Sequence, residues 1–390
     1  MEVSDLRVAL FSGNYNYIRD GANQALNRLV TYLLRHGAAV RVYSPTVAEP
    51  AFARNAEVVH LPCLPVPGRS EYKVPMMLPP RVRRDVEAFA PNLVHVSSPD
   101  FVGHRAVSLA RRLDVPVVAS VHTRFETYPR YYGLGFLEPA ATAILRRFYR
   151  RCDAIFAPSE SMAQLLRDQK MNWDVGIWSR GIDPDAFNPG RRDEAWRRGL
   201  GIPDEMPVIG FVGRLVMEKG LDVFAESIDR VARRGVAHKV LVVGDGPARE
   251  WFAKRLPDAE FVGFQGGGDL GRAVASMDIM FNPSVTETFG NVTLEAMASG
   301  LPVVAAIATG SLSLVSDGVT GRLIPAGACD RFAAALAHYC SDREARRRAG
   351  EAGERASRRY AWDEINQELV DGYMRIVRQH GEIGSGARRG

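Results

Sequence analysis

Short apolar runs alternate with amphipathic stretches along most of the chain. Residues 6–11 are largely apolar, residues 24–36 repeat leucine and valine at helical spacing, and residues 39–43 are largely apolar again. Apolar positions that recur every three to four residues indicate a helix with one buried face, whereas a short apolar run between polar residues indicates a buried strand. This strand, helix, strand order predicts a parallel sheet with helices on its faces, the α/β class.

The alternation occurs twice, which predicts two Rossmann-like domains. Further strands are predicted at residues 93–96, 115–121 and 154–158, and a new series begins at residue 208. The proline-rich residues 61–80 are predicted to be non-helical, because proline lacks a backbone donor. We expect an N-terminal domain at 1–186, a linker at 187–207, a C-terminal domain at 208–358, a terminal helix within 359–380 and a disordered Gly- and Arg-rich tail at 381–390.

The composition is that of a globular protein large enough for two hydrophobic cores. The chain has 390 residues, 46% of them hydrophobic and 24% charged. No apolar run reaches the roughly 18 residues that span a bilayer. The first strand follows directly on a polar start without a signal-like segment, and the four cysteines form no C-x-x-C pair. We therefore expect a cytoplasmic protein with reduced thiols and no zinc site.

Positive charge is concentrated in the first half of the chain. Residues 1–200 carry 27 Lys and Arg against 20 Asp and Glu, whereas residues 201–390 carry 23 against 25. A basic half favours an anionic partner, either nucleic acid or a lipid surface. Motifs typical of nucleic-acid binding are absent from the sequence, so no nucleic-acid partner is expected.

A predicted helix at residues 138–151 carries part of this charge. Arg146, Arg147, Arg150 and Arg151 follow the spacing i, i+1, i+4 and i+5, which places them in one cationic stripe. Such a stripe can contact anionic headgroups at about 1 kcal/mol per cation, which would bring the protein to the inner face of the cytoplasmic membrane. The alternative is an ordinary solvated helix face.

The most informative stretch, residues 283–303, reads P-S-V-T-E-T-F-G-N-V-T-L-E-A-M-A-S-G-L-P-V. It follows a predicted strand at 279–282 and combines a loop that contains Glu287 and Gly290 with a helix that contains Glu295. Ligands of open α/β sheets bind beyond the carboxyl ends of the strands, and free N–H groups at a helix start favour phosphate. Carboxylates accept hydrogen bonds from sugar and ribose hydroxyls, so the two acids are expected to contact different parts of one extended ligand.

This stretch strongly resembles the E-x7-E region of retaining glycosyltransferases of family 4, which have the GT-B fold. The resemblance implies that Glu287 and the loop after it, Phe289, Gly290, Asn291 and Val292, bind the transferred sugar of the donor, and that Glu295 binds the ribose of the nucleotide. It also implies two Rossmann-like domains that face each other across a cleft, with a C-terminal helix that returns to the first domain.

A second motif of the same resemblance lies after the strand at 208–212. Gly213-Arg-Leu-Val-Met-Glu-Lys-Gly220 is similar to the family's diphosphate-binding loop. Arg214 can bind two oxygens at once and Lys219 adds a point charge, and both offset charge on the leaving diphosphate. Phe264 and Leu270 fall in the region that, in the family, contacts the nucleotide base.

In the first domain, the resemblance carries over His122, at the carboxyl end of the strand 115–121, as a catalytic contact to the sugar. Gly21 corresponds to the first-loop glycine that lets donor phosphates approach, although the family often has two adjacent glycines there. The residues after His122 are expected at the rim of the acceptor site, in particular Arg124, Tyr128 and Arg130.

One acidic pair could suggest a metal site, and one stretch departs from the family's pattern. Asp183 and Asp185 form an Asp-x-Asp that we interpret as a turn, so no metal or other cofactor is expected. Residues 308–310 read A-T-G where many relatives have a glycine pair, and Ser313 stands where many have an acid. The departures at residues 308–310 and at Ser313 both concern the phosphate region.

The sequence thus predicts a retaining, metal-independent hexosyltransferase that uses a nucleotide-diphosphate sugar, GDP-mannose or a UDP-hexose, and a lipid or glycan acceptor. Two alternatives remain open at this point: another GT-B reaction, such as nucleotide-sugar epimerisation or phosphorolysis, and a non-catalytic nucleotide-sugar binder or scaffold. A nicotinamide dehydrogenase is disfavoured, because no G-x-G-x-x-G follows the first strand.

Overall fold

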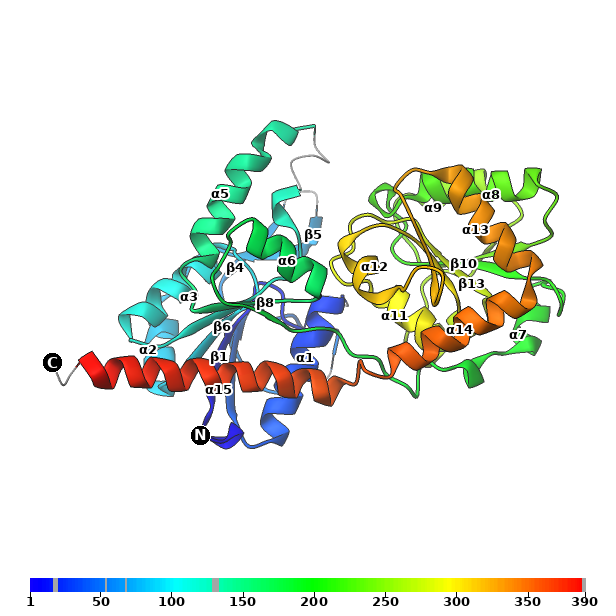
Figure 1. The fold of residues 1–390 in the computed structure, drawn as a ribbon. Coiled ribbons are helices and arrows are strands. Elements are labelled where there is room, and N and C mark those ends of the chain that lie inside the picture. The colour runs from blue at the N-terminus through cyan, green and yellow to red at the C-terminus, as the bar shows by residue number, and fades with distance from the viewer. Residues whose placement is uncertain (17–19, 53–54, 67–68, 128–132, 388–390) are drawn as a thin grey trace. The chain divides into compact units, whose positions relative to one another are not determined.

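The chain folds into two α/β units (Figure 1). The computed structural model describes residues 1–390 except 17–19, 53–54, 67–68, 128–132 and 388–390. Unit 1 comprises Met1–Arg180 together with Trp362–Gly390, and unit 2 comprises Gly181–Ala361. The chain therefore crosses between the units at 180–181 and again at 361–362.

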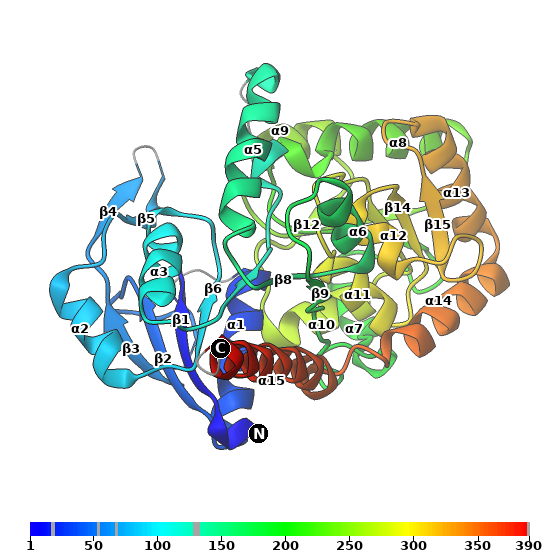
Figure 2. The same cartoon turned by 60° about the vertical axis from the view of Figure 1, so that its left-hand side comes forward.

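Unit 1 is built on a seven-stranded parallel sheet in the order β3-β2-β1-β6-β7-β8-β9. Its strands are β1 (Arg7–Phe11), β2 (Ala39–Ser44), β3 (Glu57–His60), β6 (Leu93–Val96), β7 (Val117–Ser120), β8 (Ala154–Ala157) and β9 (Val175–Ile177). Among its described residues, the proline-rich stretch is non-helical up to Pro79, and it forms an antiparallel hairpin of β4 (Cys63–Val66) and β5 (Arg69–Pro75), drawn in light blue in Figure 2.

The central strands of this sheet are buried, because helices cover its faces. The helices are α1 (Gly21–Arg35), α2 (Pro80–Phe89), α3 (Phe101–Arg112), α5 (Glu138–Tyr149), α6 (Glu160–Asp168) and α15 (Trp362–Ala387). The C-terminal α15 packs beside α1 and β9 (Figures 1 and 2). Short 3-10 turns lie at Val3–Asp5, Phe125–Thr127 and Gly135–Leu137.

Unit 2 repeats the architecture with a six-stranded parallel sheet in the order β12-β11-β10-β13-β14-β15. The strands are β10 (Val208–Val212), β11 (Lys239–Val243), β12 (Glu260–Phe261), β13 (Ile279–Asn282), β14 (Val303–Ala306) and β15 (Gly321–Ile324). The helices are α7 (Glu194–Gly199), α8 (Leu221–Arg233), α9 (Arg249–Arg255), α10 (Gly267–Ala275), α11 (Asn291–Ala298), α12 (Thr309–Leu314), α13 (Cys329–Ser341) and α14 (Arg343–Ser357), with 3-10 turns at Pro189–Arg191 and Met217–Lys219.

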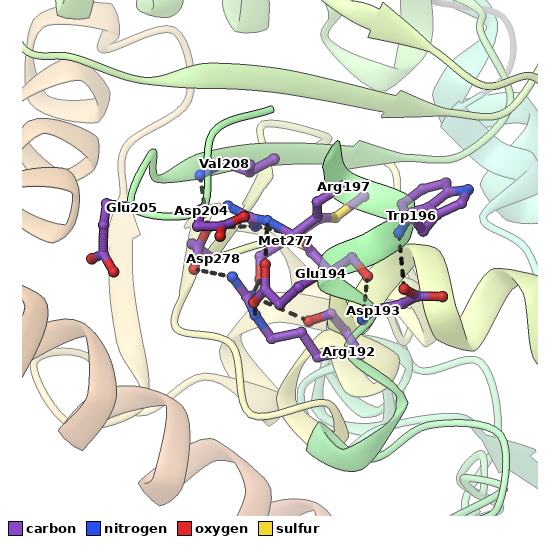
Figure 3. Close-up of polar contacts among 12 residues, drawn as sticks. Arg192, Asp193, Glu194, Trp196, Arg197, Asp204, Glu205, Val208, Met277 and Asp278 are labelled. Atoms are coloured by element: carbon purple, nitrogen blue, oxygen red, sulfur yellow. Dashed lines mark hydrogen bonds and ion pairs between the residues drawn. The ribbon is translucent and has the colours of Figure 1, made fainter. Parts of the chain in front are cut away.

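The predicted linker at 187–207 is part of unit 2. Arg197 of α7 is fully buried, and its guanidinium donates to Asp278 Oδ2 at 2.9 Å, to Ser276 O at 2.7 Å and to Met206 O (Figure 3). Asp278 Oδ2 also accepts from the backbone N–H of Val208 at 2.9 Å, so one carboxylate joins α7 to the starts of β10 and β13. The composition of an Arg-rich segment does not reveal that one arginine is buried with an acidic partner 81 residues away.

The limits of several elements also differ from the sequence prediction. The helix expected at 24–36 begins at Gly21, because Asp20 caps it by accepting from Asn23 N at 2.8 Å. Residues 381–387 are helical rather than disordered, because extending an existing helix costs less than starting one. Across the described residues, no helix is both long and apolar enough to cross a membrane.

Candidate active site

The predicted donor residues gather at one edge of the unit 2 sheet. Strands β10 and β13 are neighbours, and the strand order reverses between them. At such a switch point the loops that follow the two strands diverge and leave room for a ligand. The loop after β10 carries Arg214 and Lys219, and the loop after β13 carries Glu287. The parallel pairing of the two strands therefore brings together residues 68 positions apart.

Lys219 and Glu287 form an ion pair at this edge. Lys219 Nζ donates to Glu287 Oε1 at 2.5 Å, and the two side chains are 29% and 24% exposed. Both groups remain accessible, so a ligand with an anionic part and hydroxyl groups can contact the ammonium and the carboxylate at once. The structure thus joins two of the residues that the sequence predicted to act together.

Two residues of the A-T-G sequence, Thr309 and Gly310, position Glu287. Its backbone carbonyl accepts from Gly310 N at 2.9 Å and from Thr309 Oγ1 at 2.7 Å, at the start of α12. A side chain at Gly310 would have its Cβ 2.5 Å from Phe289 O and 3.1 Å from the Cβ of Glu287. The A-T-G sequence therefore allows α12 to support the Glu287 loop. In the sequence, the threonine followed by a glycine was the signal from which this support of the loop could have been predicted.

The loop between β13 and α11 ends at Gly290, which caps α11 with φ +95°. A residue with a side chain rarely adopts this left-handed conformation, which explains the glycine. Asn291 and Val292 open α11 and are half-buried. Phe289 is buried and packs edge to face on Tyr360, with ring centroids 5.8 Å apart. Phe289 therefore anchors the loop, while Asn291 and Val292 remain partly accessible.

Glu295 lies one turn into α11, and its carboxyl has an unusual ionisation. Burial raises the pKa of Glu295 to about 7. The carboxylate is the form that accepts hydrogen bonds from both hydroxyls of a ribose, and protonation removes part of that capacity. A pKa near 7 therefore makes the charge of this residue sensitive to pH in the working range of most enzymes.

We expect donor affinity to fall as the pH falls through 7. Between pH 8 and pH 6 the Kd for a nucleotide sugar should rise about tenfold, since below its pKa an acid loses tenfold in its ionised fraction per pH unit. Calorimetric titration with the intact nucleotide sugar, whose phosphates are both esterified, measures this. Glu295→Gln should bind weakly with a flat pH profile. An unchanged pH dependence in this variant would show that another group is responsible.

Arg214 and Gly213 lie in the loop after β10. Gly213 N donates to Val243 O at 3.0 Å, and a Cβ on Gly244 would lie 1.9 Å from Gly213 O, so the loops after β10 and β11 are closely packed. Arg214 is exposed, and within the described part of the chain its guanidinium has no hydrogen-bond or ion-pair partner. An exposed cation in the same loop as Lys219 is suited to bind phosphate.

The two residues expected at the nucleotide base lie in different settings. Phe264 is 67% exposed in the segment between β12 and α10, and Leu270 is half-buried within α10. An exposed phenylalanine is available to pack on a planar ring. The assignment of both residues to the base stays a prediction.

His122 lies two residues after β7, at the carboxyl edge of the unit 1 sheet. Both of its ring nitrogens have hydrogen-bond partners: Nδ1 with Arg180 Nη2 at 2.7 Å and Nε2 with Ser120 Oγ at 2.8 Å. Burial, with the nearby Arg180 and His95, lowers the pKa of His122 well below its usual value. The ring is therefore neutral, and no sequence pattern indicates Arg180 as its partner.

The other predicted residues of unit 1 are more scattered. Gly21 is the first residue of α1, and Arg124 pairs with Glu126 at 2.8 Å. Tyr128 and Arg130 lie outside the described residues. In the predicted stripe, Arg146 Nε donates to Gln169 O and Arg150 Nε to Lys170 O, while α5 ends at Tyr149. Arg151 donates to Ser108 Oγ, and Arg147 is exposed. Three of the four arginines thus use donors within unit 1.

A search of the described residues finds no group of three or more His, Cys, Asp or Glu arranged to hold a metal ion. Asp183 Oδ1 accepts from the backbone N–H groups of Asp185 and Ala186 at 3.2 and 3.3 Å, which is the geometry of a turn. This hydrogen bonding accounts for the Asp-x-Asp sequence as local structure.

Comparison with known proteins identifies the family. Residues 19–186 match the model of Glycosyltransferase Family 4, and residues 206–342 match that of Glycosyl transferases group 1. A GDP-mannose-dependent alpha-mannosyltransferase of Mycobacterium tuberculosis is 34% identical over 378 residues, which cover 95% of this chain and 97% of that protein. The chain belongs to glycosyltransferase family 4. It is therefore a glycosyltransferase.

This glycosyltransferase is similar to further proteins, one by sequence and one by structure. Sulfoquinovosyl transferase SQD2 of Arabidopsis thaliana is 31% identical and covers 91% of this chain and 71% of that protein. Among solved structures, sucrose-phosphate synthase from Thermosynechococcus elongatus superposes with a TM-score of 0.75 at 18% identity, over 94% of this chain and 98% of that one. At that identity the likeness shows the fold alone, and the fold is GT-B, as the sequence predicted.

Proposed function

We propose that this glycosyltransferase transfers a hexosyl group, with retention of configuration, from a nucleotide-diphosphate sugar to a hydroxyl of a lipid or glycan. The observation that carries the proposal is the Lys219–Glu287 pair at the switch point of the unit 2 sheet, with Glu295 on α11, the helix that follows the Glu287 loop. A cation and two acids at one sheet edge suit a ligand that combines a diphosphate with sugar and ribose hydroxyls.

Each residue then has a distinct task in the transfer. Glu287 accepts hydrogen bonds from hydroxyls of the transferred sugar, and Glu295 from the ribose. Arg214 and Lys219 bind the diphosphate and stabilise its charge as the bond from sugar C1 to the phosphate oxygen breaks. The acceptor oxygen attacks C1 from the same face, and its proton passes to the departing diphosphate. The positive charge comes from side chains, so the proposed reaction needs no metal.

GDP-mannose is the donor we favour. The relative from Mycobacterium tuberculosis is named for GDP-mannose and covers 95% of this chain. The contacts assigned above go to phosphates, ribose and sugar hydroxyls, which UDP-hexoses also have. Base identity therefore decides between the two donor classes, and Phe264 near the end of β12 is our candidate for packing on the base.

A membrane lipid is the acceptor class we favour, with unit 1 at an anionic surface. Exposed apolar side chains lie just before α5 and in its middle: Phe136 is 74% and Ile144 62% exposed. Arg147 is exposed on the same helix. Apolar side chains that insert beside arginines that contact headgroups are typical of peripheral membrane binding. In this proposal the protein is cytoplasmic and acts at the inner face of the membrane.

A nucleotide panel tests the donor assignment. We expect GDP and GDP-mannose to raise the melting temperature of the purified protein in the presence of EDTA, and UDP and UDP-glucose to have a smaller effect. A larger effect of UDP would move the donor to a UDP-hexose. If no nucleotide stabilises the folded protein, the proposed donor site is wrong. Tight binding without product formation would favour the scaffold alternative.

A further inference from the structure

A chain of buried and part-buried hydrogen bonds leads from the candidate sugar contact His122 to the C-terminal helix. Tyr373 Oη of α15 bonds His95 Nδ1 at 2.7 Å, and His95 Nε2 bonds Ser120 Oγ at 2.9 Å. Ser120 Oγ bonds His122 Nε2 at 2.8 Å, and His122 Nδ1 bonds Arg180 Nη2 at 2.7 Å. All five side chains belong to unit 1. None of them except His122 was predicted from the sequence.

The chemistry of arginine determines where the proton of His122 lies. A guanidinium only donates hydrogen bonds, so the Nδ1 that faces Arg180 must be unprotonated. A neutral imidazole carries one proton, which therefore lies on Nε2 and is donated to Ser120 Oγ. The serine proton in turn points to His95 Nε2, and His95 donates its own proton from Nδ1 to Tyr373 Oη. Arg180 thus selects one tautomer of His122.

Arg180 is itself firmly held. It is 5% exposed, its Nη1 donates to Trp178 O at 2.9 Å and to Ser179 O at 3.0 Å, and its guanidinium lies 5.1 Å from the centre of the Trp178 ring. These partners are neutral, and the carboxylate whose charge acts on Arg180 is Asp20, the cap of α1. The His122 ring also packs edge to face on Trp178, with centroids 5.7 Å apart.

We propose that Arg180 is a positioning residue for the transfer reaction, which holds His122 as the neutral Nε2–H tautomer in one ring orientation. The chain from Ser120 to Tyr373 supports the opposite side of the ring. Since Arg180 occupies the Nδ1 lone pair, His122 does not act as a general base through that nitrogen. The lowered pKa of His122, caused by burial, Arg180 and His95, is consistent with this arrangement. The inference rests on the proposed role of His122 in transfer, but the tautomer of His122 can be measured without turnover.

The first test is direct observation of the histidine ring. In protein labelled with ¹⁵N-histidine, the His122 signals, assigned with His122→Asn, should show a protonated Nε2 and an unprotonated Nδ1 throughout pH 6–8. Arg180→Met should lose this pattern, by tautomer exchange or by titration within that range. Ser120→Ala is the matched control, because it removes the other ring contact and leaves Arg180 in place, so Nδ1 should stay unprotonated. A protonated Nδ1 in the wild type, or the wild-type pattern in a folded Arg180→Met, would overturn the proposal.

The second test is a double-mutant cycle on kcat. Arg180→Met should lower kcat about 10- to 100-fold, the range expected when a group near the chemistry is misplaced. Because Arg180 acts through His122, adding Arg180→Met to His122→Asn should change kcat by less than about threefold. Arg180→Lys, which keeps a cationic donor, should recover part of the loss. If the fold-losses in kcat of the two single variants multiply in the double variant, Arg180 acts independently of His122. If the ¹⁵N pattern is as expected but no variant affects transfer, the proposed role of His122 is wrong and the tautomer assignment stands.

Discussion

Glu287→Ala is expected to lower kcat by about 10²- to 10³-fold while the protein stays folded. Mutation of a single group that stabilises a transition state commonly costs this much. Glu287 has the position for such a role, because its carboxylate pairs with Lys219 while a quarter of its side chain stays accessible. The lost ion pair is partly exposed, so the free energy of unfolding should change by less than about 1 kcal/mol. Steady-state transfer rates and thermal melting measure the two quantities.

Glu218→Ala is the matched control for this experiment. Glu218 is an exposed acid in the same 3-10 turn as Lys219 and lies outside the proposed contacts. The Glu218→Ala variant should retain nearly wild-type kcat. Wild-type rates in Glu287→Ala would show that the transferred sugar is bound elsewhere, and equal losses in both variants would indicate a general effect of negative charge in this region.

Arg214→Ala is expected to lower kcat/KM for the donor by a similar 10²- to 10³-fold. Arg214 is the exposed cation of the loop after β10, and the diphosphate gains charge as it leaves, so the loss should fall on kcat as well as on KM. Arg214→Lys should recover only part of the activity, because an ammonium cannot make two parallel hydrogen bonds to phosphate oxygens. Initial rates over a range of donor concentrations separate kcat from KM.

Arg343→Ala provides the control for Arg214. Arg343 is 82% exposed at the start of α14, and the account gives it no role in binding the donor. Its substitution should leave kcat/KM within about twofold of wild type, as surface substitutions usually do. If Arg214→Ala behaves like Arg343→Ala, the diphosphate is not bound by the loop after β10.

The fold class and the donor edge could be predicted from the sequence because both depend on local patterns. Apolar runs separated by amphipathic helices indicated two parallel sheets, and the motif around Glu287 placed a loop, a helix and two acids in order. Adjacent parallel strands then explain why Lys219 meets Glu287, although only the sheet order shows that β10 and β13 are neighbours.

What could not be predicted depends on contacts between distant residues. Arg197 looked like one of several linker arginines, yet it is buried against Asp278. Arg180 lies 58 residues from His122, and no sequence pattern links a guanidinium to a particular imidazole nitrogen. Thr309 and Gly310 were noted as a departure from the family, and their hydrogen bonds to the Glu287 carbonyl required coordinates. Tertiary partners of charged residues are thus the main limit of the sequence prediction.

Analysis of the product formed from GDP-α-mannose and a bacterial lipid extract, with EDTA present, tests both the donor site and the retention of configuration. We expect release of GDP together with a mannosylated lipid whose anomeric NMR signals show the α configuration, and we expect Glu287→Ala to form both products about 10²- to 10³-fold more slowly. A β-linked product would contradict retention. Release of GDP or formation of product at the wild-type rate by Glu287→Ala would contradict the assignment of the donor site.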